Sequence, residues 1–174
     1  ILVTGGAGYV GSHAVRHLRK AGHQVWVYDN LSRGNPAALL DTPLYQGNLS
    51  DTNRLVSLLG ELRIDAVMHF AAFALVGESV TDPSLYYENN VVGSLRLLQA
   101  MHEANVRKIV FSSTTATYGE PDRSPINEST PQRPINPYGV SKLMVEQILD
   151  DFARAHDFGF AALRYFNASG ASAD

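Results

Sequence analysis

The stretch ILVTGGAGYVG, residues 1–11, places a short apolar run directly before three glycines spaced as G-x-x-G-x-x-G. In a strand–turn–helix unit, the first glycine allows a tight turn, the second lets backbone approach a pyrophosphate, and the third allows close helix–strand packing. Residues 9–21 carry Val10, Ala14 and Leu18 on one face, which predicts a helix whose first N–H groups face the phosphates. The stretch therefore predicts the first unit of an α/β fold that binds a dinucleotide.

The next apolar run, residues 24–28, is followed by Asp29, close to where such folds carry the acidic residue that binds an adenosine ribose. A carboxylate there accepts hydrogen bonds from both ribose hydroxyls and repels a 2′-phosphate. The sequence therefore predicts NAD rather than NADP as the cofactor. Arg33 is a nearby cation that would favour NADP, and we interpret it as a solvated loop charge.

Apolar runs and amphipathic segments alternate along the rest of the chain, which is typical of βαβ units and a parallel sheet. The predicted class is a doubly wound α/β Rossmann fold over residues 1–174, with residues 75–80 in a loop or short turn and residues 120–137 in a proline-rich functional loop. The predicted strands cover residues 1–4, 24–28, 43–46, 64–70, 108–113 and 160–165, and the predicted helices cover residues 9–21, 52–60, 83–105 and 138–156.

The composition narrows the function classes. With 174 residues, 45% hydrophobic and 18% charged, the chain is typical of a globular domain with its own core. The net charge of −3 provides no excess of positive charge with which to bind nucleic acid. No apolar run reaches the roughly 18 residues of a membrane helix. The lack of cysteine excludes disulfides, thiol catalysis and Cys-ligated zinc. We expect a cytoplasmic protein. We also expect no metal site, not even at His13 and His17, which are spaced i, i+4.

Both ends of the sequence lie close to predicted strands. The chain begins within an apolar run without Met, and it ends in a Gly/Ser/Ala-rich segment soon after the last run. We therefore expect it to be the N-terminal part of a longer protein, with a smaller C-terminal substrate domain that this chain lacks.

The pentad Tyr138-Gly139-Val140-Ser141-Lys142 is the candidate for chemistry. Residues four apart lie on one helix face, and a nearby ammonium lowers a tyrosine pKa from ~10, so Tyr138 is a candidate general base. The alternative is an aromatic anchor beside a solvated lysine. Thr114 favours the catalytic interpretation, because hydroxyls at the carboxyl end of a parallel strand face the ligand crevice.

Other polar positions have structural interpretations. His69, on a predicted strand among apolar neighbours, is expected to be a satisfied core residue. Asn48 follows the third predicted strand and either reads an adenine edge or only closes the turn. Asn89 and Asn90 are costly within a helix, and one that faces the sheet is expected to hold a water or a backbone group.

These features together resemble the extended short-chain dehydrogenase/reductase superfamily, and within it most closely the UDP-glucose 4-epimerase family. The matching blocks span almost the whole chain and keep the family's order. They are TGGAGYVGSH at 4–13, YDNLSRG at 28–34, HFAAFALVGESV at 69–80, YYENNVVGS at 86–94, residues 111–119, YGVSKLMVEQ at 138–147 and LRYFN at 163–167.

The resemblance implies the interconversion of UDP-glucose and UDP-galactose, by reversible hydride transfer from the sugar C4 to tightly bound NAD through a 4-keto sugar. It implies that Tyr138 takes the O4 proton and that Thr114 contacts O4. It also implies that Lys142 contacts the nicotinamide ribose and, together with the positive nicotinamide, lowers the Tyr138 pKa. The implied substrate-binding residues are Thr114, Tyr138 and Asn167. The implied cofactor-binding residues are Gly5, Gly8, Tyr9, Val10, Gly11, Asp29, Asn30, Asn48, Leu49, Phe70, Ala71, Ala72, Asn89, Thr114, Tyr138, Lys142 and Tyr165.

Two positions depart from the family pattern: Asn48 stands where Asp is common, and Ala74 stands where some members carry Lys. Among relatives, 4,6-dehydratases normally carry Asp-Glu after the strand-end Thr, whereas Thr115-Ala116 follows Thr114 here. Epimerases of UDP-N-acetylhexosamines, UDP-pentoses or UDP-uronates stay open as alternatives, as does a catalytically incomplete NAD-binding fragment. The family also implies a homodimer, for which the predicted helices 83–105 and 138–156 are the candidate surfaces.

Overall fold

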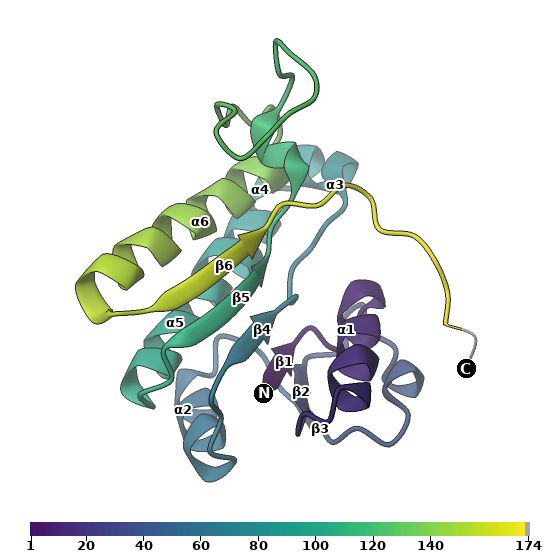
Figure 1. Ribbon diagram of the computed structural model, residues 1–174, viewed down its shortest axis with the longest axis vertical. Helices are drawn as coiled ribbons and strands as arrows, with labels where there is room; N and C mark the ends of the chain where they lie inside the picture. The colour runs from purple at the N-terminus through teal and green to yellow at the C-terminus, as the bar shows by residue number, and fades with distance from the viewer. Residues whose placement is uncertain (173–174) are drawn as a thin grey trace.

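A parallel sheet of six strands, in the order β3-β2-β1-β4-β5-β6, forms the centre of the molecule (Figure 1). The computed structural model describes residues 1–172, so the last two residues of the predicted domain lie outside the described residues. The strands are β1 (Leu2–Thr4), β2 (Trp26–Asp29), β3 (Leu44–Gln46), β4 (Val67–His69), β5 (Lys108–Ser112) and β6 (Gly159–Leu163). The helices are α1 (Tyr9–Lys20), η1 (Pro36–Leu39), α2 (Thr52–Glu61), α3 (Val76–Thr81), α4 (Pro83–Tyr86), η2 (Tyr87–Val92), α5 (Gly93–Glu103), η3 (Thr115–Tyr118) and α6 (Pro137–His156).

The strand order reverses between β1 and β4. The chain runs from β1 outward to β3, then returns to β4 beside β1 and continues outward to β6. In open parallel sheets, ligands bind at such a switch point, beyond the carboxyl ends of the strands. The predicted doubly wound Rossmann fold is confirmed, and the glycine-rich turn lies at the switch point.

Alternate residues of the strands build two separate cores. Leu2 and Tyr28 belong to the larger core, which the strands share with α2, α5 and α6, whereas Val3 and Val27 point to the opposite face and pack with α1 and η1. Figure 1 shows α1 on one side of β1, β2 and β3, and α2, α5 and α6 on the other side. Among residues 1–172, no helix covers β5 and β6 on the α1 side.

Two predicted elements differ from the structure. Residues 76–81, expected in a loop or short turn, form the helix α3. The helix predicted over residues 83–105 is interrupted by the π-helical turn η2, because the side chain of Asn90 is buried and its amide binds the backbone N–H and C=O of Phe73. A π turn accommodates one residue more than a regular turn, which lets the amide of Asn90 reach that loop. The expectation that an inward-facing Asn here holds a backbone group is confirmed.

No helix within residues 1–172 combines the length and the apolar character that a membrane span requires.

The longest helix described, α6, begins with a well-formed cap, in which the side chain of Asn136 accepts a hydrogen bond from Gly139 N at 2.9 Å. Pro137 fits the first helical position because it needs no hydrogen-bond partner there. Pro137 and Asn136 therefore fix where α6 starts.

The glycine-rich turn leaves no room for a side chain at Gly11, where a Cβ atom would lie 2.2 Å from the carbonyl oxygen of Gly5. We predict that Gly11→Ala lowers the free energy of unfolding by about 2 kcal/mol or more, because backbone cannot yield to the added methyl group. Gly60→Ala is the matched control: no atom lies within 4 Å of its added Cβ, and helix propensity favours Ala by ~0.5–1 kcal/mol. Urea unfolding of both variants measures the difference, and equal effects of the two changes would contradict the prediction.

Candidate functional site

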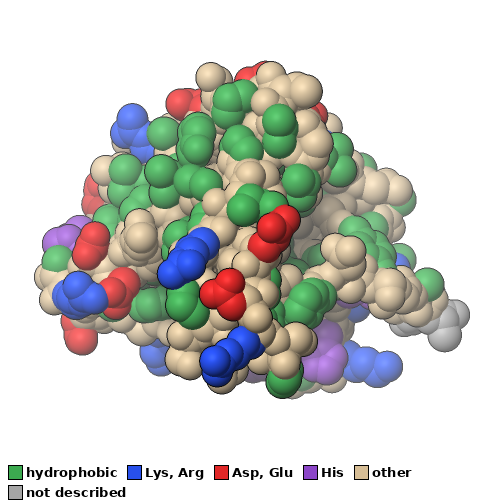
Figure 2. All heavy atoms as spheres, turned by 90° about the horizontal axis from the view of Figure 1, so that it is seen from above, with side chains coloured by type: hydrophobic (Ala, Val, Ile, Leu, Met, Phe, Trp, Pro, Cys, Tyr) green, Lys and Arg blue, Asp and Glu red, His purple; other side chains and the backbone are tan. Residues whose placement is uncertain are grey.

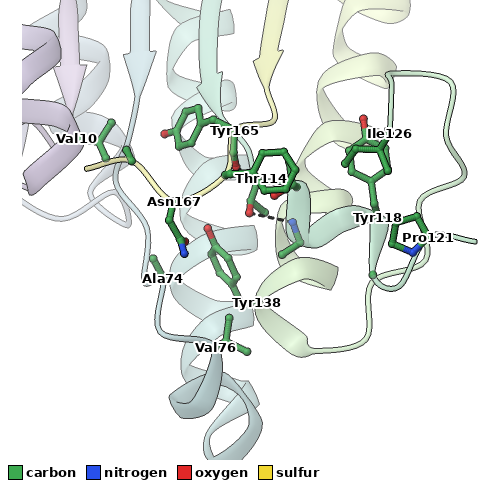
Figure 3. A pocket seen from close by; sticks show the side chains of 15 residues that line it. Val10, Ala74, Val76, Thr114, Tyr118, Pro121, Ile126, Tyr138, Tyr165 and Asn167 are labelled. Atoms are coloured by element: carbon green, nitrogen blue, oxygen red, sulfur yellow. Dashed lines mark hydrogen bonds between the residues drawn. The ribbon is translucent and has the colours of Figure 1, made fainter. Parts of the chain in front are cut away.

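A cavity of about 650 Å³ lies beyond the carboxyl ends of β1, β4, β5 and β6. The side chains of Thr114, Tyr138, Tyr165 and Asn167 line it, and they reach it from three separate segments of the chain (Figure 3). Seen from above, this end of the molecule carries hydrophobic side chains over its upper half, while most charged side chains in view lie below them or at the margins (Figure 2). The cavity is thus a largely apolar space with a small number of hydroxyl and amide groups, as small-molecule sites usually are.

Thr114 and Tyr138 meet because the short helix η3 packs closely against the first turn of α6. Thr114 follows β5 and caps η3, where its hydroxyl oxygen accepts a hydrogen bond from Ala116 N at 3.1 Å (Figure 3). The first turn of α6 lies against the same segment, since a Cβ atom at Gly139 would be 2.7 Å from the carbonyl oxygen of Ala116. A larger residue after Tyr138 would push α6 away from η3, so the glycine of the pentad is a packing requirement.

The electrostatics of Tyr138 differ from the expectation. Burial raises the pKa of Tyr138 above its usual value of 10.0, and a side-chain hydrogen bond with Thr114 lowers it by less. Lys142 is not among the causes of this shift, and its predicted lowering of the Tyr138 pKa together with a bound nicotinamide stays a prediction. The ammonium of Lys142 instead donates a hydrogen bond to the carbonyl oxygen of Ser112 at 2.8 Å.

Lys142 is almost fully buried, with its side chain beside the ring of Phe111. Desolvation lowers the pKa of Lys142 to about 7, and the negative charge of Glu146 acts in the opposite direction. A buried lysine with a pKa near neutrality is unusual in a purely structural position and is typical of functional sites.

The carboxylate of Glu146, one turn beyond Lys142 on α6, connects the segments that carry the site. It accepts hydrogen bonds from the hydroxyl of Ser113 and from the guanidinium of Arg164, whose Nη2 lies 2.6 Å from Oε2. Ser113 directly precedes Thr114, and Arg164 directly precedes Tyr165. One buried ion pair therefore fixes α6, the end of β5 and the end of β6 relative to one another.

A second, smaller cavity of about 90 Å³ adjoins the glycine-rich turn and the ends of β2 and β4. Asp29 lies there with both carboxylate oxygens held by backbone, Oδ2 by Ala7 N at 3.0 Å and Oδ1 by Leu31 N at 2.8 Å. Its remaining lone pairs can accept hydroxyl hydrogens. No side chain caps the N-terminus of α1 at Gly8, so the first N–H groups of α1 face the groove as a phosphate cradle requires. The residues present therefore fit an adenine dinucleotide without a 2′-phosphate.

The family model described as "NAD dependent epimerase/dehydratase family" matches residues 1–174. The chain belongs to this family.

Among curated relatives, the UDP-glucose 4-epimerase of Lactobacillus helveticus is 53% identical over 100% of this chain and 53% of the relative. The probable UDP-arabinose 4-epimerase 3 of Arabidopsis thaliana is 47% identical over 98% of this chain and 44% of the relative. A crystal structure of the Brucella ovis UDP-glucose 4-epimerase in complex with NAD superposes with a TM-score of 0.96 at 48% identity, covering 98% of this chain and 53% of that one. The chain thus spans about half the length of the relatives it matches.

The structure brings most of the predicted cofactor residues of this family member into adjoining cavities. Gly5, Gly8, Asp29, Asn30, Phe70, Ala71, Ala72 and Asn89 line the cavity at the glycine-rich turn, whereas Val10, Thr114, Tyr138 and Tyr165 line the larger one. Asn48 lines a third cavity of about 370 Å³, which also includes Asn30 and Asn89. The cavities together follow the sheet edge from β3 to β6, as an extended dinucleotide would.

Four predicted residues do not line these cavities. Leu49 is buried in the larger core, and Gly11 packs against Gly5. The hydroxyl of Tyr9 donates to the carbonyl oxygen of Gly170 at 2.6 Å, and Lys142 lies behind the main cavity. The side-chain oxygen of Asn48 accepts from Ser50 N at 3.0 Å, so that side chain does close the turn.

Sequence reasoning missed several residues of the site. Arg33 is exposed, as expected of a solvated loop charge, but it also has partners: its guanidinium lies 2.7 Å from both carboxylate oxygens of Glu78 and 4.0 Å from the ring centre of Phe73. Tyr86 is completely buried, and its ring edge contacts Tyr138. The only signal in the sequence was the position of Arg33 after the second strand, since partners so far apart in the chain leave no local pattern.

His69 has the structural role that the sequence predicts. It is buried, with Nδ1 2.7 Å from the hydroxyl of Thr4 and Nε2 2.8 Å from that of Ser94. Because Ser94 donates its own hydrogen to Asn90 O, Nε2 carries the ring proton and Nδ1 accepts from Thr4. The described residues 1–172 contain no cluster of three His, Asp or Glu side chains that could hold a metal ion.

Burial lowers the pKa of His69 to about 3, with a further contribution from the charge of Lys142. The unfolded chain then binds more protons than the folded one between pH ~6.5 and ~3, so stability is full above this window and falls as the pH drops through it. We predict that His69→Asn has a shallower loss of stability with acid than the parent protein. Urea unfolding at several pH values measures the slope, with the exposed His23→Asn as control. A His69→Asn slope as steep as the control's would contradict the prediction.

Proposed function

We propose that residues 1–174 form the NAD-binding domain, with the catalytic Thr114, Tyr138 and Lys142, of a UDP-glucose 4-epimerase that interconverts UDP-glucose and UDP-galactose. The observation that carries the proposal is the shared cavity of Thr114, Tyr138 and Asn167, which adjoins the glycine-rich cradle. The similarity to named UDP-glucose 4-epimerases over the full length of the chain supports the same activity.

Each residue has a task in this proposal. The phenol oxygen of Tyr138 takes the proton from O4 of the sugar, and the hydroxyl of Thr114 orients that oxygen. Asn167, at the exit of β6, contacts the nucleotide part of the substrate. Bound NAD would supply a reversible acceptor for the hydride of C4, held by the cradle at Gly5 and Gly8 and by other residues of the groove.

Lys142 would contact the ribose next to the nicotinamide and hold the site positive. Its ammonium donates one hydrogen bond to Ser112 O, and its other N–H groups are the ones that would make that contact. The pair Thr115-Ala116 after Thr114 offers no acid or base for dehydration, which favours epimerisation over 4,6-dehydration.

This chain provides few side chains that would reach the sugar. The relative named as a probable UDP-arabinose 4-epimerase favours a UDP-pentose as the second candidate. We propose that a C-terminal domain beyond residue 174 completes the sugar site, in line with relatives of about twice this length.

The test is a spectrum of the full-length protein loaded with NAD. Addition of UDP-galactose should produce NADH-like absorbance, and coupled assays should show conversion to UDP-glucose.

Tyr138→Phe should keep the cofactor and lose turnover by about 10²–10⁴-fold, because the proton acceptor is gone. Near-normal turnover of Tyr138→Phe would reject its role, and equal rates with UDP-N-acetylgalactosamine or UDP-arabinose would widen the substrate class.

We further propose a homodimer that uses α4–α5 and α6. Leu85 and Met144 on these helices are large hydrophobic residues with 36% and 39% of their surface exposed. Light scattering of the full-length protein should give twice the mass of one chain, and Met144→Glu should shift it towards the monomer. A monomer at all concentrations would contradict the proposal.

The cytoplasmic location expected from the sequence stays a prediction.

A further inference from the structure

Arg33 makes two contacts that are unusual for a loop residue beside a cofactor groove. Its guanidinium stacks on the ring of Phe73 with 4.0 Å from Cζ to the ring centre, and its Nη2 lies 2.7 Å from both carboxylate oxygens of Glu78. The two charged side chains are 38% and 32% exposed, so the pair lies at the surface of the groove and not in the core.

These contacts cross the groove. Arg33 follows β2, whereas Phe73 and Glu78 follow β4, and β1 lies between these two strands in the sheet. The turn that leaves β1 carries Gly5 and Gly8, which line one small cavity together with Arg33 and Phe73. A contact between the segments after β2 and β4 therefore bridges the phosphate cradle at the end of β1.

Both sides of the bridge are firmly anchored. The amide of Asn90 binds Phe73 N at 2.8 Å and Phe73 O at 3.0 Å, which fixes the ring on which Arg33 stacks. The hydroxyl of the buried Tyr86 lies 2.7 Å from Oε2 of Glu78, which fixes the carboxylate. Such preorganised partners lose little conformational freedom when the bridge forms.

We propose that Arg33, Phe73 and Glu78 form a clasp over the dinucleotide groove that slows the release of bound NAD. The inference rests on the proposed cofactor. A dinucleotide whose pyrophosphate lies on the cradle leaves only after the Arg33–Glu78 and Arg33–Phe73 contacts have parted. The clasp therefore affects the rate of release and contributes no group to the reaction at C4.

The same contacts decide against another role for Arg33. An arginine after the second strand of such a fold can bind the 2′-phosphate of NADP. Here Nη2 of Arg33 is paired with the carboxylate of Glu78, and the guanidinium plane lies on the ring of Phe73. Both the edge and the face of the guanidinium therefore already have partners. Glu78 would also repel an incoming phosphate.

The experiment measures the release of NAD from the full-length protein loaded with isotopically labelled NAD and chased with excess unlabelled NAD. Arg33→Gln should release label about tenfold faster, because it removes both the exposed ion pair and the cation–π contact. Glu78→Gln should also release label faster than the parent, but by less, because Arg33 still stacks on Phe73. The double variant should be no faster than Arg33→Gln, because Arg33 takes part in both contacts. Arg19→Gln is the matched control: Arg19 is 37% exposed and paired with Asp41, and it lies in the last turn of α1, at the opposite end of that helix from the groove. Its release rate should stay at the parent value.

Equal release rates in Arg33→Gln, Glu78→Gln and the parent protein would overturn the clasp while leaving the proposed function intact. A loss of NADP binding in Arg33→Gln without faster NAD release would also overturn it, because Arg33 would then be a phosphate receptor. A parent protein that binds no NAD would overturn the proposed function and the clasp together. Melting temperatures within about 2 °C of the parent value would show that the variants are folded.

Discussion

The ion pair between Glu146 and Arg164 is the interaction on which the geometry of the site depends. Through the Ser113 hydroxyl and the Arg164 guanidinium, one carboxylate joins α6 to the ends of β5 and β6. Hydrogen bonds of Thr115 and Ser112 with Tyr165 also hold the ends of β5 and β6 together. Because the Glu146 side chain is 7% exposed and the Arg164 side chain 22%, removing one partner would leave the other charge largely desolvated and without compensation. The fold thus places a strong electrostatic interaction directly behind Thr114 and Tyr138.

Burial dominates the pKa of Tyr138. Burial raises this pKa, and Lys142, itself desolvated to a pKa of about 7, is bound to backbone rather than to the phenol. The packing of η3 against the first turn of α6 positions the hydroxyls of Thr114 and Tyr138. The fold therefore determines the geometry of this hydroxyl pair through backbone packing.

The sequence predicted the architecture because its signals are local. The glycine spacing, Asp29 after the second strand and the pentad at Tyr138 are each readable within a few residues, and the strand–helix alternation orders them at one edge of the sheet. It could not predict what depends on distant contacts. Arg33 was interpreted as solvated because Phe73 and Glu78 lie about forty residues further along the chain, and the side-chain direction of Lys142 depends on Ser112 O, which no helical spacing reveals. The π turn was missed for the same reason, since Asn90 is unfavourable until its partner in the β4 loop is known.

The π turn at Tyr87–Val92 also determines how the sequence can vary. It is in effect a single-residue insertion in a helix that would otherwise run from Pro83 to Glu103. Deleting one residue there would give a more regular helix, yet it would turn α5 by ~100° relative to α4. Ser94 would swing away from His69, and Leu97 and Met101 would leave the core. A change in the length of this helix would therefore change which of its residues face the core and the site.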